Sequence, residues 1–280
     1  MSKMFSHPVT HTTLTRTLRF LSLIVLVIVA YPRASHAQQA IETETARPLG
    51  NGVVELGAAY EFQRSVGGLE HALPFAFELG IGDRFELLVE PVAVTAIRPS
   101  AGNGPNATGV GDLEITGFGL IAHETPYTPA ISLGVELKLP TARNNQIGTL
   151  KTDIAGYVIG SKLIGPVDVH VNLGYTVIGQ PMGVTANNIF SFAVAGVLPL
   201  DEHHEAFAEC YGNTAASPDG ESGDAGGVVL VPELAAGEVV GSGGVAWKPT
   251  QHIEFSLGAS YDTNKAFQLR TGFVFRGRVF

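Results

Sequence analysis

The chain ends in the stretch AFQLRTGFVFRGRVF, residues 266–280, which decides the fold. It has the length of a single β-strand, and its last residue, Phe280, is aromatic. Four apolar side chains recur with the two-residue period of a strand that has one apolar face: Phe267, Leu269, Phe273 and Phe275. Phe280 falls on the opposite face, and a β-bulge around Arg276–Arg278 would restore its parity. We therefore predict a terminal strand that closes a β-sheet.

The other terminus has the organisation of a secretory signal peptide. An apolar run of 11 residues, Phe20–Ala30, follows basic residues and precedes a small-x-small pattern at Ser35–Ala37. This run is shorter than the roughly 20 residues that a transmembrane helix needs. We assign residues 1–37 to a cleaved signal peptide, with retention as an uncleaved anchor as the alternative. The mature chain then begins near Gln38, with a short periplasmic segment over 38–51 and a barrel over 52–280.

The charge of the mature chain excludes some classes of partner. Residues 1–37 hold four basic residues and no acidic one, so the remainder carries 13 basic and 26 acidic residues, a net charge of about −13. Binding to nucleic acid or to anionic lipid needs clustered Lys and Arg, so we expect neither. The 34 glycines and a mean hydropathy of +0.22 fit a strand-rich chain with many turns. Cys210 is alone, which excludes an intramolecular disulfide.

Alternation of apolar and polar residues continues along the whole mature chain. In Ile131–Leu139, for example, every second residue is Ile, Leu or Val. The pattern predicts twelve strands, with ten or fourteen as alternatives: 52–64, 70–80, 85–98, 110–122, 130–140, 151–163, 168–179, 189–198, 205–213, 237–247, 253–261 and 266–280. An even number places both termini in the periplasm, and the longest connections then all fall outside.

The apolar side chains decide between a membrane barrel and a soluble one. A soluble sandwich or lipocalin-like barrel would also show alternation, but its outward face would be polar. Here a whole belt of Val, Leu, Phe and Tyr would be left in water, well beyond the few hundred Å² usual for a monomer. We therefore predict an all-β fold, a closed antiparallel transmembrane β-barrel. Two strands have faces that stay unassigned. In 151–163, apolar residues occur with both parities, at Tyr157, Ile159 and Leu163 and at Ile154 and Val158. In 205–213, Phe207 shares its parity with Glu205 and Glu209.

Several sequence runs resemble a known outer-membrane family. Four stretches carry the resemblance: Glu44–Phe62, Gly109–Ile115, Leu133–Thr141 and Val171–Tyr175. They are similar to consecutive strands of the β-barrel family named for the MetA pathway of phenol degradation. The resemblance implies passage of small, often aromatic or hydrophobic, compounds across the outer membrane, and it brings no catalytic residues. The chain departs from the family in the parity of its last strand and in the long loop 213–233.

Acidic residues dominate the face that the alternation sends inward. Such a ring would disfavour anions and tolerate cations or neutral solutes, although the same groups could hydrogen-bond one another and water. The candidate pore-lining residues are Glu55, Glu61, Glu78, Glu86, Glu90, Asp112, Glu114, Glu136, Lys138, His170 and Glu254. Lys138 and His170 are the main inward residues that we expect to oppose these carboxylates.

The residues offer little support for a metal site or an enzyme. His203, His204 and Glu205 are adjacent, and neighbouring side chains on a strand point to opposite faces, so they converge on one ion only if they stay in a turn. Lipid-facing hydrolysis needs a His and a Ser on adjacent strands of the outer face, whereas His170 points inward and has no serine in its own strand. We expect no catalytic residues, no metal and no cofactor. The loop 213–233 is interpreted as irregular, with an inward constriction or an ion site as alternatives.

The sequence thus predicts a passive outer-membrane channel for small solutes. The alternative is a non-conducting barrel with a structural or surface role, because a twelve-stranded lumen lies between the filled and open cases. The expected partners are outer-membrane lipid, the small-molecule solutes, and the barrel-assembly machinery acting through the strand that ends at Phe280. Nucleic acid is not among them.

Overall fold

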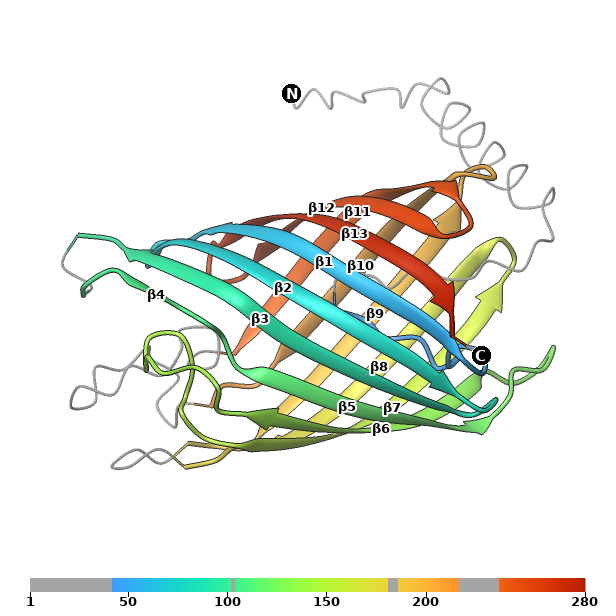
Figure 1. The fold of residues 1–280 in the computed structure, drawn as a ribbon, viewed down its shortest axis with the longest axis horizontal. Coiled ribbons are helices and arrows are strands. Elements are labelled where there is room, and N and C mark those ends of the chain that lie inside the picture. Colours follow the sequence, from blue (N-terminus) through green and yellow to red (C-terminus); the bar gives the residue numbers. More distant parts are fainter. Residues whose placement is uncertain (1–41, 102–103, 181–185, 217–236, 280) are drawn as a thin grey trace, which may run out of the picture.

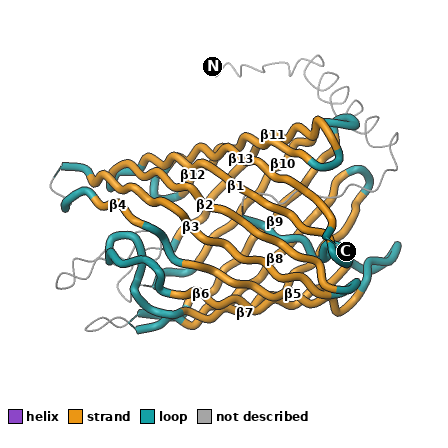
Figure 2. Tube along the Cα trace, viewed as in Figure 1, coloured by secondary structure: helices purple, strands orange, loops and turns teal. Residues whose placement is uncertain are grey.

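The computed structural model describes residues 42–279 apart from 102–103, 181–185 and 217–236. The predicted signal peptide, Phe280 and most of the loop 213–233 therefore lie outside the described residues. Figure 2 shows that the described chain consists of strands joined by loops. None of the described residues forms a helix long and apolar enough to span a bilayer.

Thirteen strand segments form one closed sheet (Figure 1). Their bounds are β1 (Val53–Arg64), β2 (Gly68–Ile81), β3 (Phe85–Pro99), β4 (Ala107–Gly109), β5 (Leu113–Ala122), β6 (Ala130–Leu139), β7 (Asp153–Ile164), β8 (Val167–Val177), β9 (Ile189–Pro199), β10 (His204–Asn213), β11 (Glu238–Thr250), β12 (Ile253–Asp262) and β13 (Phe267–Arg278). Because β4 and β5 both pair with β3 and follow one another, they are two pieces of a single barrel strand. The fold is the predicted closed twelve-stranded antiparallel barrel.

The first and last strands close the barrel. β1 pairs with β13 in an unbroken register from Val53↔Arg278 to Arg64↔Phe267. The expected bulge at Arg276–Arg278 is therefore wrong, since this part of β13 pairs regularly. Register shifts occur instead at Leu73/Pro74, Leu120/Ala122 and Trp247/Thr250, which bend strands elsewhere in the wall.

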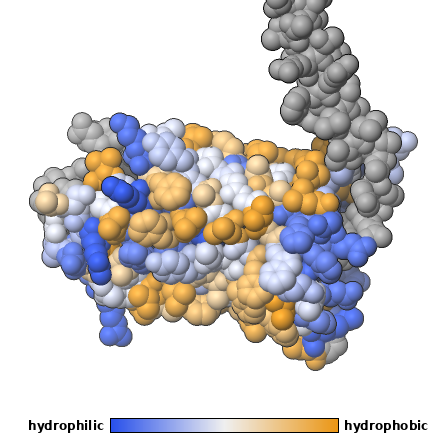
Figure 3. Space-filling view, turned by 90° about the horizontal axis from the view of Figure 1, so that it is seen from above, coloured by the Kyte–Doolittle hydropathy of each residue, from blue (hydrophilic) through white to orange (hydrophobic). Residues whose placement is uncertain are grey.

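The outward face of the barrel is apolar. Leu133 and Val171 are 48% and 39% exposed, whereas Ser132, one residue from Leu133, is 1% exposed. Figure 3 shows hydrophobic residues in orange along the middle of the visible face and hydrophilic residues in blue gathered toward its ends. Such a belt matches the hydrocarbon layer of a bilayer.

The structure assigns the two strands whose faces the sequence left open. In β7, Ile154 and Val158 point outward, and Ile159 points into the barrel at 1% exposure. In β10, Phe207 is buried on the inner face together with Glu205 and Glu209.

The two ends of the barrel differ in the length of their connections. At one end, here called the turn end, adjacent strands are joined by turns such as Gly82–Arg84 and Gly165–Pro166. Gly82 and Gly165 have φ of 64° and 62°, a conformation that favours glycine in tight turns. The connections longer than ten residues, 140–152, 178–188 and 214–237, join strands at the opposite end, here called the loop end. The chain enters β1 at the turn end.

Candidate functional site

The residues before β1 lie inside the barrel. We call Glu42–Asn51 the N-terminal strap. Its backbone bonds to inward-facing side chains: Leu49 N donates to Glu86 Oε2 at 2.6 Å, and Ala46 N donates to Ser161 Oγ at 2.7 Å. The carbonyl of Ala46 accepts from Ser132 Oγ at 2.7 Å. The strap therefore rises from the turn end into the lumen, which the expectation of a short periplasmic segment did not foresee.

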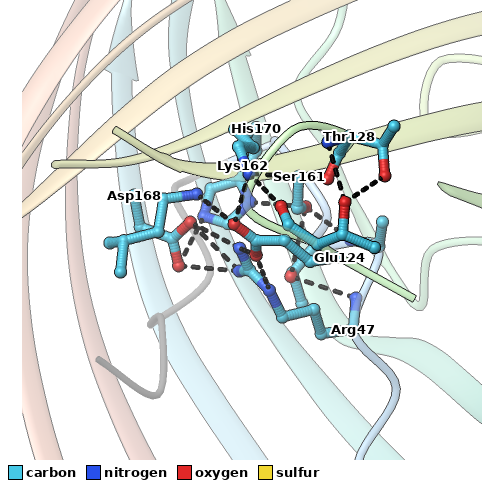
Figure 4. A network of polar contacts seen from close by, with 11 residues as sticks. Arg47, Glu124, Thr128, Ser161, Lys162, Asp168 and His170 are labelled. Atoms are coloured by element: carbon cyan, nitrogen blue, oxygen red, sulfur yellow. Dashed lines mark hydrogen bonds and ion pairs between the residues drawn. The ribbon is translucent and has the colours of Figure 1, made fainter. Parts of the chain in front are cut away.

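Arg47 anchors the strap to the wall at the turn end (Figure 4). Its Nη1 donates to Asp168 Oδ2 at 2.8 Å, and its Nη2 donates to Glu124 Oε2 at 2.6 Å. Lys162 Nζ lies 3.3 Å from Glu124 Oε1. Burial alone would raise the pKa of Glu124, but the hydrogen bonds from Arg47 and from the backbone of Leu163 hold it below its ordinary value.

The inner end of the strap is held by a single carboxylate. Glu209 Oε2 accepts from Thr43 N at 2.9 Å, from Thr43 Oγ1 at 2.7 Å and from Glu42 N at 3.1 Å. Its Oε1 accepts from Ser242 Oγ at 2.8 Å. These bonds satisfy a carboxylate that is only 5% exposed, as burial of a charge requires.

Apolar packing fills the space beside the strap. Ala46 is fully buried in a cluster that comes from the inner faces of β3, β5, β6 and β7: Leu88, Phe118, Leu120, Ala130 and Ile159. The turn-end half of the lumen is thus occupied on this side by the strap and by hydrophobic side chains.

A cavity of about 420 Å³ occupies the part of the lumen beyond the inner end of the strap. Its wall includes the loop-end residues Gln63, Asn213 and Gln268, and Glu42 of the strap also contacts it. Among the described residues that line it, none is a Lys or Arg and five carry carboxylates: Glu42, Glu61, Glu70, Glu238 and Asp262. The cavity is therefore acidic and polar.

The structure places all the candidate pore-lining residues on the inner side of the wall. Of these residues, Glu61 lines the cavity and also meets Arg270 Nε at 3.3 Å. Glu86 binds the strap, and Glu136 accepts from Tyr157 OH at 2.9 Å.

A row of charges crosses four neighbouring strands. Glu90 is paired in register with Glu114, Glu114 with Lys138, and Lys138 with Asp153. Lys138 forms an ion pair with Asp153 and lies 3.9 Å from Asp112 Oδ2. The carboxylates at this height are thus partly compensated within the wall.

The lumen contains cationic side chains in addition to the predicted Lys138 and His170. Arg276 Nε donates to Glu55 Oε1 at 2.5 Å. Lys248 Nζ lies 2.8 Å from Glu205 Oε2 and 3.5 Å from Glu254 Oε2. Glu78, 6% exposed, is the most buried of the predicted glutamates. Alternation with the outward phenylalanines of β13 is the signal that would have found Arg276.

His170 belongs to a buried cluster under the strap. Ser161 Oγ and His170 Nδ1 are 2.8 Å apart, so a serine does meet this histidine, from the neighbouring strand β7. His170 Nε2 lies 3.8 Å from Asp168 Oδ2, beyond hydrogen-bond distance. Since all three residues are at most 2% exposed and Ser161 also binds Ala46, the cluster supports the strap and presents no accessible nucleophile.

His203 lies in the turn before β10, and His204 is the first residue of that strand. His203 Nδ1 is 2.9 Å from the carbonyl of Lys248, and His204 Nδ1 is 2.9 Å from Asp201 Oδ1. Glu205 instead points inward to Lys248. Within the described ranges, no group of three metal-ligating side chains comes together.

The closed barrel, its apolar belt and its polar interior define a membrane β-barrel. No family model and no curated protein matches the sequence. An outer membrane channel from Pseudomonas putida is similar in fold, with a TM-score of 0.61 and 12% identity over 86% of this chain and 100% of that one. NanC porin gives a TM-score of 0.53 and 9% identity over 79% and 98% of the two chains. KdgM porin, solved with disordered oligogalacturonate, gives 0.50 and 10% over 78% and 98%.

Proposed function

We propose that this protein is a passive channel for small solutes in the outer membrane of a Gram-negative-type cell. The loop end faces outward, and the turn end, with the strap, faces the periplasm. The solved outer membrane channel and porins that share the fold support this class, and the signal-peptide pattern of residues 1–37 supports export. Assembly proceeds through the barrel-assembly machinery and the C-terminal strand.

The single observation that carries the proposal is the acidic cavity above a non-covalently held strap. A lumen meant only as structural filling would favour apolar side chains, because burying carboxylates is costly even where they have partners. Here five carboxylates line the cavity of about 420 Å³. We infer selectivity for cations and neutral solutes over anions, with the inward-facing residues from Glu55 to Glu254 as the pore lining.

The nature of the solute follows from the resemblance of the sequence. The runs that resemble the MetA-pathway family favour small, aromatic or otherwise hydrophobic compounds, and membership of that family stays a proposal. A covalent reaction is not part of the proposed function, because the Ser161–His170 pair is buried under the strap.

A second candidate function is a non-conducting barrel with a structural or surface role. The packing of Ala46 against Phe118 and Ile159 favours it, because it fills space that a solute would cross. In the channel, by contrast, the strap must move aside or leave a path along the opposite wall.

Flux into liposomes tests the proposal. The refolded mature chain should pass Na⁺ and small sugars faster than chloride, measured against protein-free liposomes. A matched variant without residues 42–49 should pass them faster still. Absence of flux in both proteins, each verified as a folded barrel, would refute the channel and favour the structural role.

A further inference from the structure

The arginines of the barrel differ in their partners. Those inside the lumen have carboxylate partners, as Arg47, Arg270 and Arg276 do. In contrast, Arg64 and Arg98 are exposed on the outer surface at the loop end, and within the described part of the chain neither forms an ion pair or a side-chain hydrogen bond. An arginine without a partner on a membrane barrel is a candidate for binding something outside the protein.

The register places these two arginines on one face. Arg64 of β1 is paired with Leu69 of β2, and Leu69 is paired with Arg98 of β3. Cross-strand partners share a face of the sheet, so Arg64 and Arg98 flank Leu69 on the outer surface. Two strand spacings separate their Cα atoms by about 10 Å. Both guanidinium groups can therefore reach a common ligand between them.

The turn between β12 and β13 carries a third exposed cation beside this rim. Arg64 is paired with Phe267, and the exposed Lys265 lies two residues before Phe267. Ala266 N donates to Asp262 Oδ1 at 2.7 Å, which fixes this turn. The carboxylates nearby, Glu70 and Asp262, line the cavity inside the barrel. At this rim, positive charge therefore faces outward and negative charge faces inward.

Aromatic side chains mark the membrane boundary below the arginines. Tyr60 OH is 2.7 Å from His71 Nδ1, and the ring of Phe62 lies 5.3 Å from that of His71. Tyr and Trp belts sit at headgroup level in membrane proteins. Arg64 is four residues farther along β1 than Tyr60, so it lies about 10 Å nearer the loop end for a tilted strand. Arg64 therefore lies just outside the headgroup level, and its long side chain can reach back to the lipid phosphate groups.

We propose that Arg64, Arg98 and Lys265 form a binding site for the phosphate groups of the lipopolysaccharide of the outer leaflet. Arginine binds phosphate through two parallel hydrogen bonds, and a pair of arginines on a rigid sheet presents four such donors to one headgroup. The net charge of the chain predicted no affinity for anionic lipid, because it does not show where the few cations gather. The site rests on the proposed orientation, with the loop end outward.

The affinity of the refolded mature chain for lipopolysaccharide tests the site. The probes are lipopolysaccharide, the same lipid stripped of its lipid A phosphates, and inorganic phosphate. The double variant R64Q/R98Q should bind the phosphorylated lipid at least tenfold more weakly and the stripped lipid as the wild type does. The matched control Arg84→Gln, an exposed arginine of the turn end, should bind like the wild type. Heat-modifiable gel mobility verifies folding, and R98Q alone serves if the double variant fails to fold.

Four outcomes would overturn the site. Equal affinity of R64Q/R98Q and wild type, or an equal loss in the Arg84 control, would remove the role of this rim. Inorganic phosphate that binds as tightly as the lipid would make it a site for free anions. A protease-sensitive tag in the connection 140–152 separates the site from the proposed orientation. Cleavage of the tag on intact cells confirms the orientation, whereas protection of the tag refutes both the orientation and the lipid site.

Discussion

Replacement of Arg47 by Met should release the strap and increase solute flux. The change removes the guanidinium that binds Asp168, a carboxylate only 2% exposed, and Glu124. Breaking a buried ion pair from one side costs about 3–5 kcal/mol, because the remaining charge is left without a partner. Arg47 is 32% exposed, so solvent screening lowers our figure to about 2–3 kcal/mol. Release of the strap lets water reach Asp168 and recovers that energy.

The effect on the strap equilibrium follows directly. A change of about 2–3 kcal/mol corresponds to roughly a 30- to 160-fold shift toward the released strap. The assay is Na⁺ flux into liposomes together with single-channel conductance, at equal amounts of folded barrel. The double variant R47M/D168N, which removes both charges, should lie closer to the wild type, and the double-mutant cycle gives the coupling energy. Flux of R47M within twofold of the wild type would refute the view that the strap limits passage.

Other perturbations test the wall, the closure and the cavity. Leu133→Arg should destabilise the barrel by about 2–4 kcal/mol in a denaturant titration in lipid, whereas Gln63→Arg in the cavity wall should cost much less; equal costs would reverse our assignment of faces. Deletion of residues 274–280 removes five register pairs with β1 and should prevent assembly of a heat-modifiable barrel, so a normal yield would contradict closure through β13. Enclosure in the barrel raises the pKa of Glu42 to about 8, and the carboxylates of Glu209 and Glu61 add to this against the opposing charge of Arg270. Because Glu42 loses its proton as the pH rises through this value, cation selectivity should grow from pH 7 to pH 9; Glu42→Gln should reduce this growth, and an unchanged slope would assign it to another group.

The wall of the barrel was largely predictable because each strand carries its own two-residue period. Ile131–Leu139 shows which face meets lipid without reference to any other segment, and the structure confirms it. The same rule leaves β10 open, because Phe207 is apolar on the inner face. There the packing inside the barrel overrides the simple division into apolar-out and polar-in.

The site was much less predictable, because the strap has no period to read. Its position depends on contacts such as Arg47 with Asp168, 121 residues apart in the chain. The strap also changes the surroundings of wall residues: Ser132, which the alternation sends into a wet lumen, is 1% exposed and bonded to Ala46. An arginine at Ser132 would therefore displace the strap. For this reason Ser132 is unsuitable as the inward-facing control for Leu133→Arg.

The strap also constrains the order of assembly. It leads directly into β1, which forms the seam with β13, and Val279 N donates to Gly52 O at this seam. Its hydrogen-bond partners lie on β3, β6, β7, β8 and β10, so the strap crosses the lumen from one side of the barrel to the other. Inserting ten residues through the turn end of a finished cylinder would mean forming all these contacts inside a closed wall, whereas the wall can close around a strap that is already in place. The sheet then closes around the strap as a template. Variants that loosen the strap should therefore slow the last step of barrel closure as well as open the finished protein.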